Sequence, residues 1–380
     1  MVFVLFIVSR LLIFFGAFAA QKVVPYLGFF PYREVLTDYN LPSWILSFAN
    51  FDGIHYLLIA RRNYSQWEQA FFPLFPILIR ALSYIIHNYL IAALFISNIS
   101  FLIGLIIFNK LLKIWNIKTT FPLLLLLSFP TAFFFGVVYT EGLFFMVFIL
   151  SLYFLNKKQY WLAGICAILS SATRLIGIFL IIPFFFHFLS EKKGALNLKS
   201  LITNLKLVIF SPFLGLFSYM AYLWKTTGDP LFFFHSQPIF GAHRSTHLIL
   251  LPQVYYRYIR ILLTARHDFQ WYLSLLEMCV FSVVFLVLLL DLVDIIKKCK
   301  KPNSKVYFLL GINILSFFNL VLPTLTGTFS SIPRYALFSL SFFLYLGQLK
   351  SMKLKIGIII VSITLQIILL SLFIQGYFVG

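Results

Sequence analysis

The sequence predicts an all-α protein that crosses a membrane many times. Of its 380 residues, 61% are hydrophobic and only 11% are charged. Soluble domains carry about 25% charged residues, so a chain of this composition cannot cover a water-facing surface with polar groups. Apolar runs of about 20 residues, the length that spans a bilayer as a helix, recur along the chain. We therefore expect one integral membrane domain over residues 1–380.

The apolar runs predict about eleven spanning helices. The block from Phe121 to Ser190 is too long for two spans, and "SFPTAFFFGVVYTEG", "NKKQYW" and "SSATRLIG" interrupt it, so we divide it into four shorter helices. The first run of the chain lacks a basic leading segment, and we expect it to be retained rather than cleaved as a signal peptide. Outside the block 121–190, the runs that meet the length rule are this first run, Phe3–Ala20, and Leu90–Phe108, Leu205–Trp224, Leu276–Ile296, Val306–Pro323, Ala336–Gly347 with its flanks, and Ile356–Ile374.

The placement of the charges predicts how these helices are oriented. Lysines anchor one side, because 17 of the 19 lie in the segments 110–118, 157–158, 192–206, 297–305 and 350–355. The positive-inside rule makes these segments cytoplasmic, which puts the N-terminus inside and the C-terminus outside. The 11 arginines show the opposite bias: ten lie in the outer loops or at their membrane edges, and Arg10 lies within the first helix.

Two extracytoplasmic segments, 21–87 and 225–270, are long enough to carry a functional site. Both contain aromatic stretches that are too short or too mixed to span. In "WEQAFFPLFPILIRALSYI", Pro73 and Pro76 are typical of a broken helix that lies in the membrane interface. We expect interfacial helices in both segments.

Asp52, in "FDGIHY" of the first outer segment, is the candidate catalytic residue. A carboxylate at a membrane surface can accept a proton from a hydroxyl, and partial desolvation raises its basicity. His55 adds a polar group to the same stretch. The alternative is that Asp52 caps the helix predicted for "GIHYLLIARR", a position that Asp favours. The two roles do not exclude each other.

Three further residues near the outer face are candidates for binding a substrate. Glu141, in "VVYTEGLFF", lies at membrane depth, where an ionisable residue is a candidate for a functional role. The alternatives are that it caps the following helix or pairs with an arginine. Arg174, in "SSATRLIG", requires an anionic partner, either Glu141 or a ligand phosphate. Arg334, in "SSIPRYAL", follows Pro333 at the outer end of a predicted helix. An arginine at a helix end can instead be an anchor that extends its charge to the membrane surface.

The second outer segment combines histidines and arginines in a pattern that suits phosphate. Arg257 and Arg260 are three residues apart and share a helix face, where attraction to anionic lipid head groups is the alternative. A metal site formed by histidines with Asp229 matches no usual ligand spacing, and we predict no metal. The remaining basic residues of the segment that we consider for a phosphate site are His235, His243 and Arg244.

The sequence lacks the motifs of soluble nucleotide-dependent enzymes. It contains no phosphate-binding P-loop, dinucleotide fingerprint, kinase motif set, serine elbow or HExxH. We predict no cofactor. The three cysteines have no disulfide or zinc spacing. The net charge of +19 does not by itself indicate nucleic acid, and we expect no nucleic-acid partner.

Several stretches together resemble the GPI mannosyltransferase 2 family, the PIG-V-like proteins of the GT-C glycosyltransferase class. The stretches are "FDGIHYLLIARRNY", "AFFPLFPILIR", "SFPTAFFFGVVYTEGLFF", "ATRLIGIFLIIP", "TGDPLFFFHSQPIFGAHRS" and "SSIPRYAL". One departure is Phe51, where the family commonly has tryptophan before the aspartate. The compact chain with its short cytoplasmic loops is more similar to the prokaryotic members than to the eukaryotic enzymes.

The resemblance implies a GT-C type bundle whose first outer loop carries the catalytic acid, here Asp52. It also implies a polyprenyl- or dolichyl-phosphate-mannose donor, inversion at the anomeric carbon and a lipid-linked or other extracytoplasmic acceptor. Asp52 is then the general base. The residues expected to bind the donor phosphate and substrate are His55, Glu141, Arg174, His243, Arg244 and Arg334.

A different class of function remains open from the residues alone. Arginines and a buried Glu141 also suit a transporter or lipid flippase, although such folds often show internal repeats and midplane sites, and none is evident here. The resemblance to prokaryotic members favours the cell membrane of a prokaryote; in a eukaryote we expect the endoplasmic reticulum.

Overall fold

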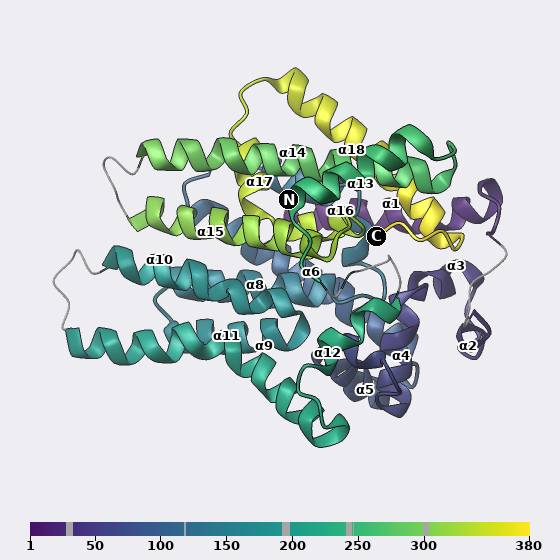
Figure 1. The fold of residues 1–380 in the computed structure, drawn as a ribbon, viewed down its shortest axis with the longest axis horizontal. Coiled ribbons are helices and arrows are strands. Elements are labelled where there is room, and N and C mark those ends of the chain that lie inside the picture. The colour runs from purple at the N-terminus through teal and green to yellow at the C-terminus, as the bar shows by residue number, and fades with distance from the viewer. Residues whose placement is uncertain (28–32, 118, 192–197, 241–244, 246, 299–303) are drawn as a thin grey trace.

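The computed structural model of the chain describes residues 1–27, 33–117, 119–191, 198–240, 245, 247–298 and 304–380. Every regular element in this part of the chain is an α- or 3-10 helix, as predicted (Figure 1). The prediction of a helical membrane protein is supported, because five helical segments are long and apolar enough to cross a bilayer. They are α1 (Val2–Val23), α6 (Tyr89–Ile114), α14 (Phe269–Lys298), the segment Lys305–Thr326 formed by α15 (Ser304–Val321) with a 3-10 turn, and α18 (Met352–Ile374).

The long apolar block divides into four α-helices at the three predicted interruptions. They are α7 (Phe121–Ser128), α8 (Glu141–Asn156), α9 (Tyr160–Thr173) and α10 (Ile181–Glu191). These helices are shorter than a bilayer crossing requires at 1.5 Å per residue. They pack between the longer helices, so protein rather than lipid surrounds much of the broken backbone.

The predicted span at 336–347 is wrong as a single long helix. The structure breaks it into α16 (Ile332–Tyr335), a 3-10 turn and α17 (Leu340–Leu346), with Ser339 between the turn and α17. The Ser339 hydroxyl donates to the carbonyl of Ser316 and accepts from Asn319. Buried neighbouring side chains thus support an irregular backbone that hydropathy alone reads as a span.

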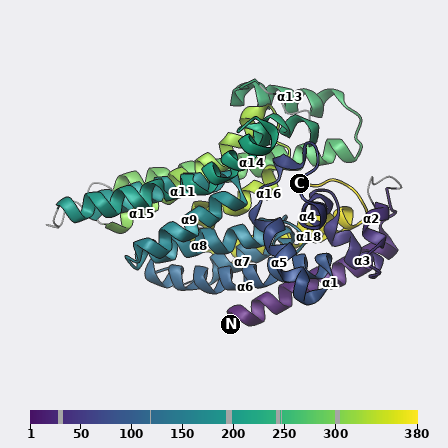
Figure 2. The same cartoon turned by 90° about the horizontal axis from the view of Figure 1, so that it is seen from below.

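The long helices lie side by side and form the body of the molecule. α11 (Leu198–Thr227) packs on α9, α8 on α6 and α9, α15 on α10 and α14, and α1 on α18 (Figures 1 and 2). The core between them is aromatic: the rings of Phe101 and Phe135 stack with centroids 4.2 Å apart. Aromatic pairs of this kind add to the stabilisation from burial itself.

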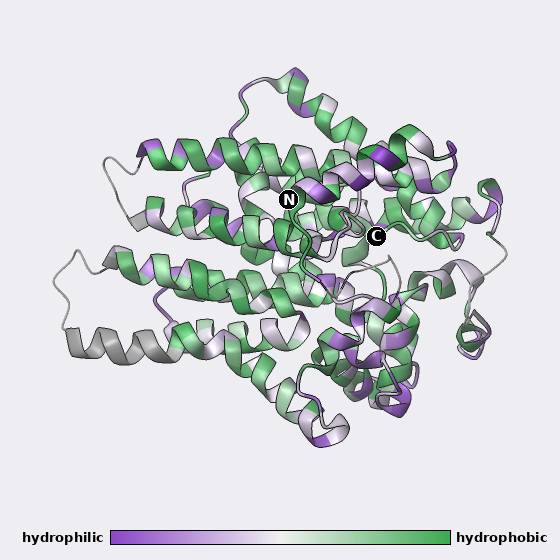
Figure 3. Cartoon of the chain, in the orientation of Figure 1, coloured by the Kyte–Doolittle hydropathy of each residue, from purple (hydrophilic) through white to green (hydrophobic). Residues whose placement is uncertain are grey.

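The short helices gather at one end of the body, at the right in Figure 1. The hydropathy colouring shows many of the hydrophilic residues there (Figure 3). In segment 21–87, Pro73 separates a 3-10 turn from the amphipathic α5, and Pro76 lies in the first turn of α5, where proline is tolerated. The elements of this end are α2 (Arg33–Thr37), α3 (Ser43–Leu46), α4 (Asp52–Arg62), α5 (Leu74–Ile86), α12 (Phe232–His235) and α13 (Leu251–Thr264).

Candidate functional site

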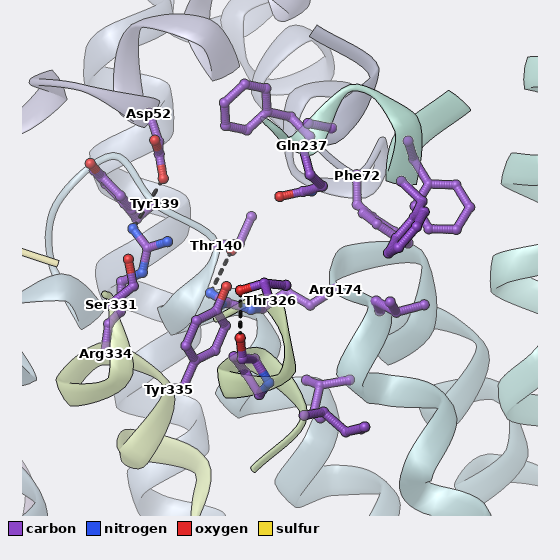
Figure 4. A pocket seen from close by; sticks show the side chains of 18 of the residues that line it. Asp52, Phe72, Tyr139, Thr140, Arg174, Gln237, Thr326, Ser331, Arg334 and Tyr335 are labelled. Atoms are coloured by element: carbon purple, nitrogen blue, oxygen red, sulfur yellow. Dashed lines mark hydrogen bonds and ion pairs between the residues drawn. The ribbon is translucent and has the colours of Figure 1, made fainter. Parts of the chain in front are cut away.

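A cavity of about 310 Å³ opens among these short helices and the neighbouring ends of longer ones. Its polar wall carries Asp52, Arg174 and Arg334, which Figure 4 shows. Glu141 also lines it. The rest of its wall is largely aromatic and aliphatic, including Phe179. Four of the residues singled out in the sequence therefore meet in one place.

Asp52 occupies the first turn of α4 but does not cap it. The N-cap position is Phe51, which has φ +58°, and the helix has no side-chain cap hydrogen bond. The capping interpretation is therefore wrong. The backbone before Asp52 is tied to the far end of the chain, because the Asn50 amide donates to the carbonyl of Phe373. An acidic residue in the first turn of a helix also gains from the positive end of the helix dipole.

The carboxylate of Asp52 points to Arg334 and pairs with it. Asp52 Oδ2 lies 3.0 Å from Arg334 Nη1, and the Asp52 side chain keeps 25% of its exposure. Arg334 is 9% exposed, so it is not a snorkelling anchor. Its guanidinium lies 5.4 Å from the ring centroids of both Phe134 and Tyr139, in the range of a cation–π contact. Asp52 is thus held beside a fixed cation while it still faces the cavity.

Glu141 links the two arginines. Its side chain has no exposure, and its Oε1 accepts a hydrogen bond from Arg174 and lies 3.3 Å from Arg334 Nε. Of the two partners foreseen for Arg174, the structure therefore contains Glu141. Arg174 also donates to the Thr140 hydroxyl at 3.2 Å, and its guanidinium lies 5.5 Å from the ring of Tyr335. The result is a chain of alternating charges from Asp52 to Arg174.

The hydrogen-bonding capacity of this charge chain is not used up within the described residues. Glu141 Oε2 and Arg334 Nε are buried and make no hydrogen bond there. Two carboxylates and two guanidinium groups sum to zero net charge, and both arginines line the cavity. A bound anion would therefore meet two preorganised cations whose own repulsion is already offset by Glu141.

Tyr56, one turn after Asp52 on α4, adds a neutral donor to the cavity wall. Burial first, and then the negative charge of Asp52, raise the pKa of the Tyr56 phenol far above its usual range. The phenol therefore stays protonated at any physiological pH.

His55 does not line the cavity. Its Nδ1 lies 3.3 Å from Glu68 Oε1, and its ring stacks on Phe71 with centroids 5.1 Å apart. Burial alone would raise the pKa of the Glu68 carboxyl. Hydrogen bonds from His55 and from the Ser65 backbone N–H, together with the charge of Arg62, outweigh burial and hold this pKa below its usual range. This cluster supports the loop after α4.

The described basic residues of segment 225–270 make separate contacts. His235 pairs with Asp229 at 2.6 Å in an exposed position. Arg257 donates to the carbonyl of Gly327 at 3.2 Å, and Arg260 is exposed on α13. His243 and Arg244 lie outside the described residues. No three potential metal ligands cluster in the described part of the chain.

One buried network beside the cavity was not singled out from the sequence. Glu277 of α14 accepts a hydrogen bond from the Tyr258 hydroxyl of α13 at 2.8 Å and another from the backbone of Ser331 at 3.3 Å. The Tyr258 hydroxyl in turn accepts from the backbone of Phe329. Ser331, with φ +65°, begins the turn that presents Arg334. The signal in the sequence was a lone acid at the start of an apolar run, Glu277.

The comparisons with known proteins return nothing: no family model, no curated protein and no solved structure matches this chain. The resemblance to the GPI mannosyltransferase 2 family is therefore a hypothesis that depends on the quoted stretches. What the chain does must be argued from the geometry of the cavity.

Proposed function

We propose that this protein is a membrane glycosyltransferase of the GT-C class. It transfers mannose from a polyprenyl- or dolichyl-phosphate donor to a hydroxyl of a lipid-linked or other extracytoplasmic acceptor. The observation that carries the proposal is the pairing of a cavity-facing carboxylate, Asp52, with a cation, Arg334, in the wall of an open cavity. The resemblance supplies the identity of the sugar and its carrier.

The chemistry of the proposal is a single displacement. The acceptor oxygen attacks the anomeric carbon, its proton passes to Asp52, and the bond between that carbon and the donor phosphate breaks. The phosphate departs with the electron pair. Arg334 and Arg174 oppose the charge that develops on it, and they require no rearrangement because Glu141 already orients both. Inversion at the anomeric carbon follows from the single displacement.

The apolar part of the cavity suits the lipid carrier. Leu175, Ile176 and Phe179 line the cavity from the segment after Arg174, and Leu322 lines it from the 3-10 turn after α15. An isoprenoid chain lying along these residues would place its phosphate beside the guanidinium groups. Burying the chain away from water supplies binding energy in proportion to its apolar area.

The same proposal includes the topology. We infer about eleven membrane crossings, a cytoplasmic N-terminus and an extracytoplasmic C-terminus from the apolar runs and from the placement of the lysines along the sequence. The membrane is the cell membrane if the chain is prokaryotic and the endoplasmic reticulum membrane if it is eukaryotic.

The decisive experiment is mannose transfer by purified protein in lipid vesicles. Radiolabelled polyprenyl-phosphate-mannose is supplied with a total lipid extract as acceptor, and wild type is compared with Asp52→Asn. We expect this variant to lose roughly 10²- to 10⁴-fold in rate, the usual contribution of a general base. The matched control is Asp38→Asn, which removes an exposed carboxylate of the same loop, 3.4 Å from Arg61, and leaves the rate unchanged.

Full activity of a folded Asp52→Asn variant would move the base elsewhere. If wild type transfers glucose from the corresponding donor but not mannose, the sugar assignment is wrong and the reaction class is kept. If no lipid product forms while labelled substrate crosses sealed vesicles, the protein is a transporter or flippase.

A further inference from the structure

A second cavity, of about 740 Å³, opens at the other end of the helix bundle. Its lining includes Lys297 and Lys298 at the C-terminal end of α14 and Lys305 at the start of α15. Lys297 follows Glu277 by 20 positions on α14, which is about 30 Å along a helix. Figure 1 shows the C-terminal end of α14 at the left, far from the short helices α4 and α5.

The charge of this cavity is not neutralised by the protein. Lys297 has an exposed neighbour, Asp294, at 3.8 Å, whereas Lys298 and Lys305 have no carboxylate within ion-pair distance among the described residues. Among the described residues of the lining, Asp291 is the one acid. Three lysines and one carboxylate leave a net charge of +2 on the wall.

Asp291 is already engaged inside the protein. Its Oδ2 accepts hydrogen bonds from Asn313 at 2.9 Å and from the Ser341 hydroxyl at 2.6 Å, and the residue is 8% exposed. These bonds join α14 to α15 and α17. The carboxylate thus ties together three helices that line the cavity, and its charge is engaged within the protein.

The uncharged wall has two characters. Asn116 and Gln348 provide amide groups, and Leu309 and Leu344 provide apolar surface. A lining that combines cations, amides and aliphatic side chains matches an amphiphilic anion. The positive end of the α15 helix dipole lies at the same place and favours a negative charge.

We propose that this cavity binds a phosphate group, that of an anionic membrane phospholipid, as a second ligand site remote from Asp52. Its lysines lie at the ends of long apolar helices, where lipid head groups are found. Lysines beside a membrane also act simply as topological anchors. The difference is that an anchor needs charge only, whereas this site needs both the lysines and the hollow between them.

Two variants of equal charge separate a site from an anchor. Lys298→Gln with Lys305→Gln removes two lysines of the cavity. Lys350→Gln with Lys353→Gln removes two lysines from the α17–α18 region that do not line it. Phosphatidylglycerol is titrated onto the detergent-purified full chain, and bound lipid is counted by native mass spectrometry. Each lysine beside an anionic surface contributes about fivefold to the affinity for anionic lipid. We therefore expect lipid affinity to fall roughly tenfold or more in the Lys298/Lys305 variant only.

A third variant tests the hollow itself. Leu309→Trp keeps every charge and fills the apolar part of the cavity, and we expect it to reduce retention of the lipid. The site would be overturned if both lysine pairs lost lipid binding equally. It would also be overturned if Leu309→Trp and the Lys298/Lys305 variant each bound lipid as wild type does. A cooperative melting transition in the same detergent confirms that each variant is folded. If the double variant at Lys298 and Lys305 is unfolded, the single variant Lys298→Gln is used in its place.

Inorganic phosphate distinguishes the two sources of the ligand chemistry. The lipid assignment predicts that millimolar phosphate leaves phosphatidylglycerol bound. If phosphate displaces the lipid from wild type but not from the Lys298/Lys305 variant, the ligand is a soluble phosphate and the lipid assignment is overturned. None of these measurements depends on mannose transfer.

Discussion

The two ends of the helix bundle handle charge in opposite ways. At the Asp52 end, Glu141 has no exposed side-chain surface and pairs with Arg174, and Arg334 is 9% exposed and pairs with Asp52. At the other end, Lys297 is 72% exposed and lies 3.8 Å from its nearest carboxylate. Both ends carry several cations, but only the first holds them in fixed positions.

The chemical difference between the two cations explains this division. A guanidinium is planar, presents several donors in fixed directions and stacks on aromatic rings, as Arg174 does against Tyr335. An ammonium on a long stem is strongly hydrated and is most stable where water reaches it. A site that must oppose charge on a departing phosphate needs the first kind. A surface that only has to attract an anion can use the second.

The largest expected effect comes from breaking the buried charge chain. Glu141→Gln leaves Arg174 and Arg334 close together without the carboxylate between them. Removing one partner of a buried ion pair costs about 3–5 kcal/mol, so we expect a large loss of stability against denaturation in detergent. Glu34→Gln, which removes an exposed acid on α2, is the control and should leave stability unchanged. Equal melting of the two variants would mean that Glu141 is not needed to hold the arginines.

An intermediate effect is expected from the network under Ser331. Tyr258→Phe leaves Glu277 Oε2 and the Phe329 N–H without their hydrogen bonds to the phenol. An unsatisfied buried polar group costs about 1–3 kcal/mol, and the loss should appear in the unfolding free energy. Tyr256→Phe changes an exposed tyrosine of the same helix and should have no effect. A similar result for both tyrosines would show that the network contributes nothing.

The smallest effect is expected at the lysine end. Lys297→Gln removes an exposed pair with Asp294 three residues earlier on α14. Exposed pairs contribute about 0–1 kcal/mol and are screened by salt, so the unfolding free energy should change little at physiological ionic strength. A loss as large as that of Glu141→Gln would erase the contrast between the two ends.

The sequence predicted the four charged residues of the cavity wall because each stood out locally. Glu141 and Arg174 interrupt apolar runs, and Asp52 and Arg334 stand beside turn-forming residues. The breaks in the block 121–190 were predictable for the same reason, since polar and turn-forming stretches interrupt a helix wherever they occur. Hydropathy could not resolve 336–347, because a buried irregular segment is as apolar as a span.

The amino-acid sequence by itself determined that the chain is helical and embedded in a membrane, since about 20 consecutive apolar residues behave alike in any surroundings. Only the tertiary structure decided which charges meet. Asp52 and Arg334 are 282 positions apart, and His55, three residues from Asp52, turns to Glu68 instead. Pairing depends on how α4, α8, α9 and α16 pack, and no local property of the sequence carries that information.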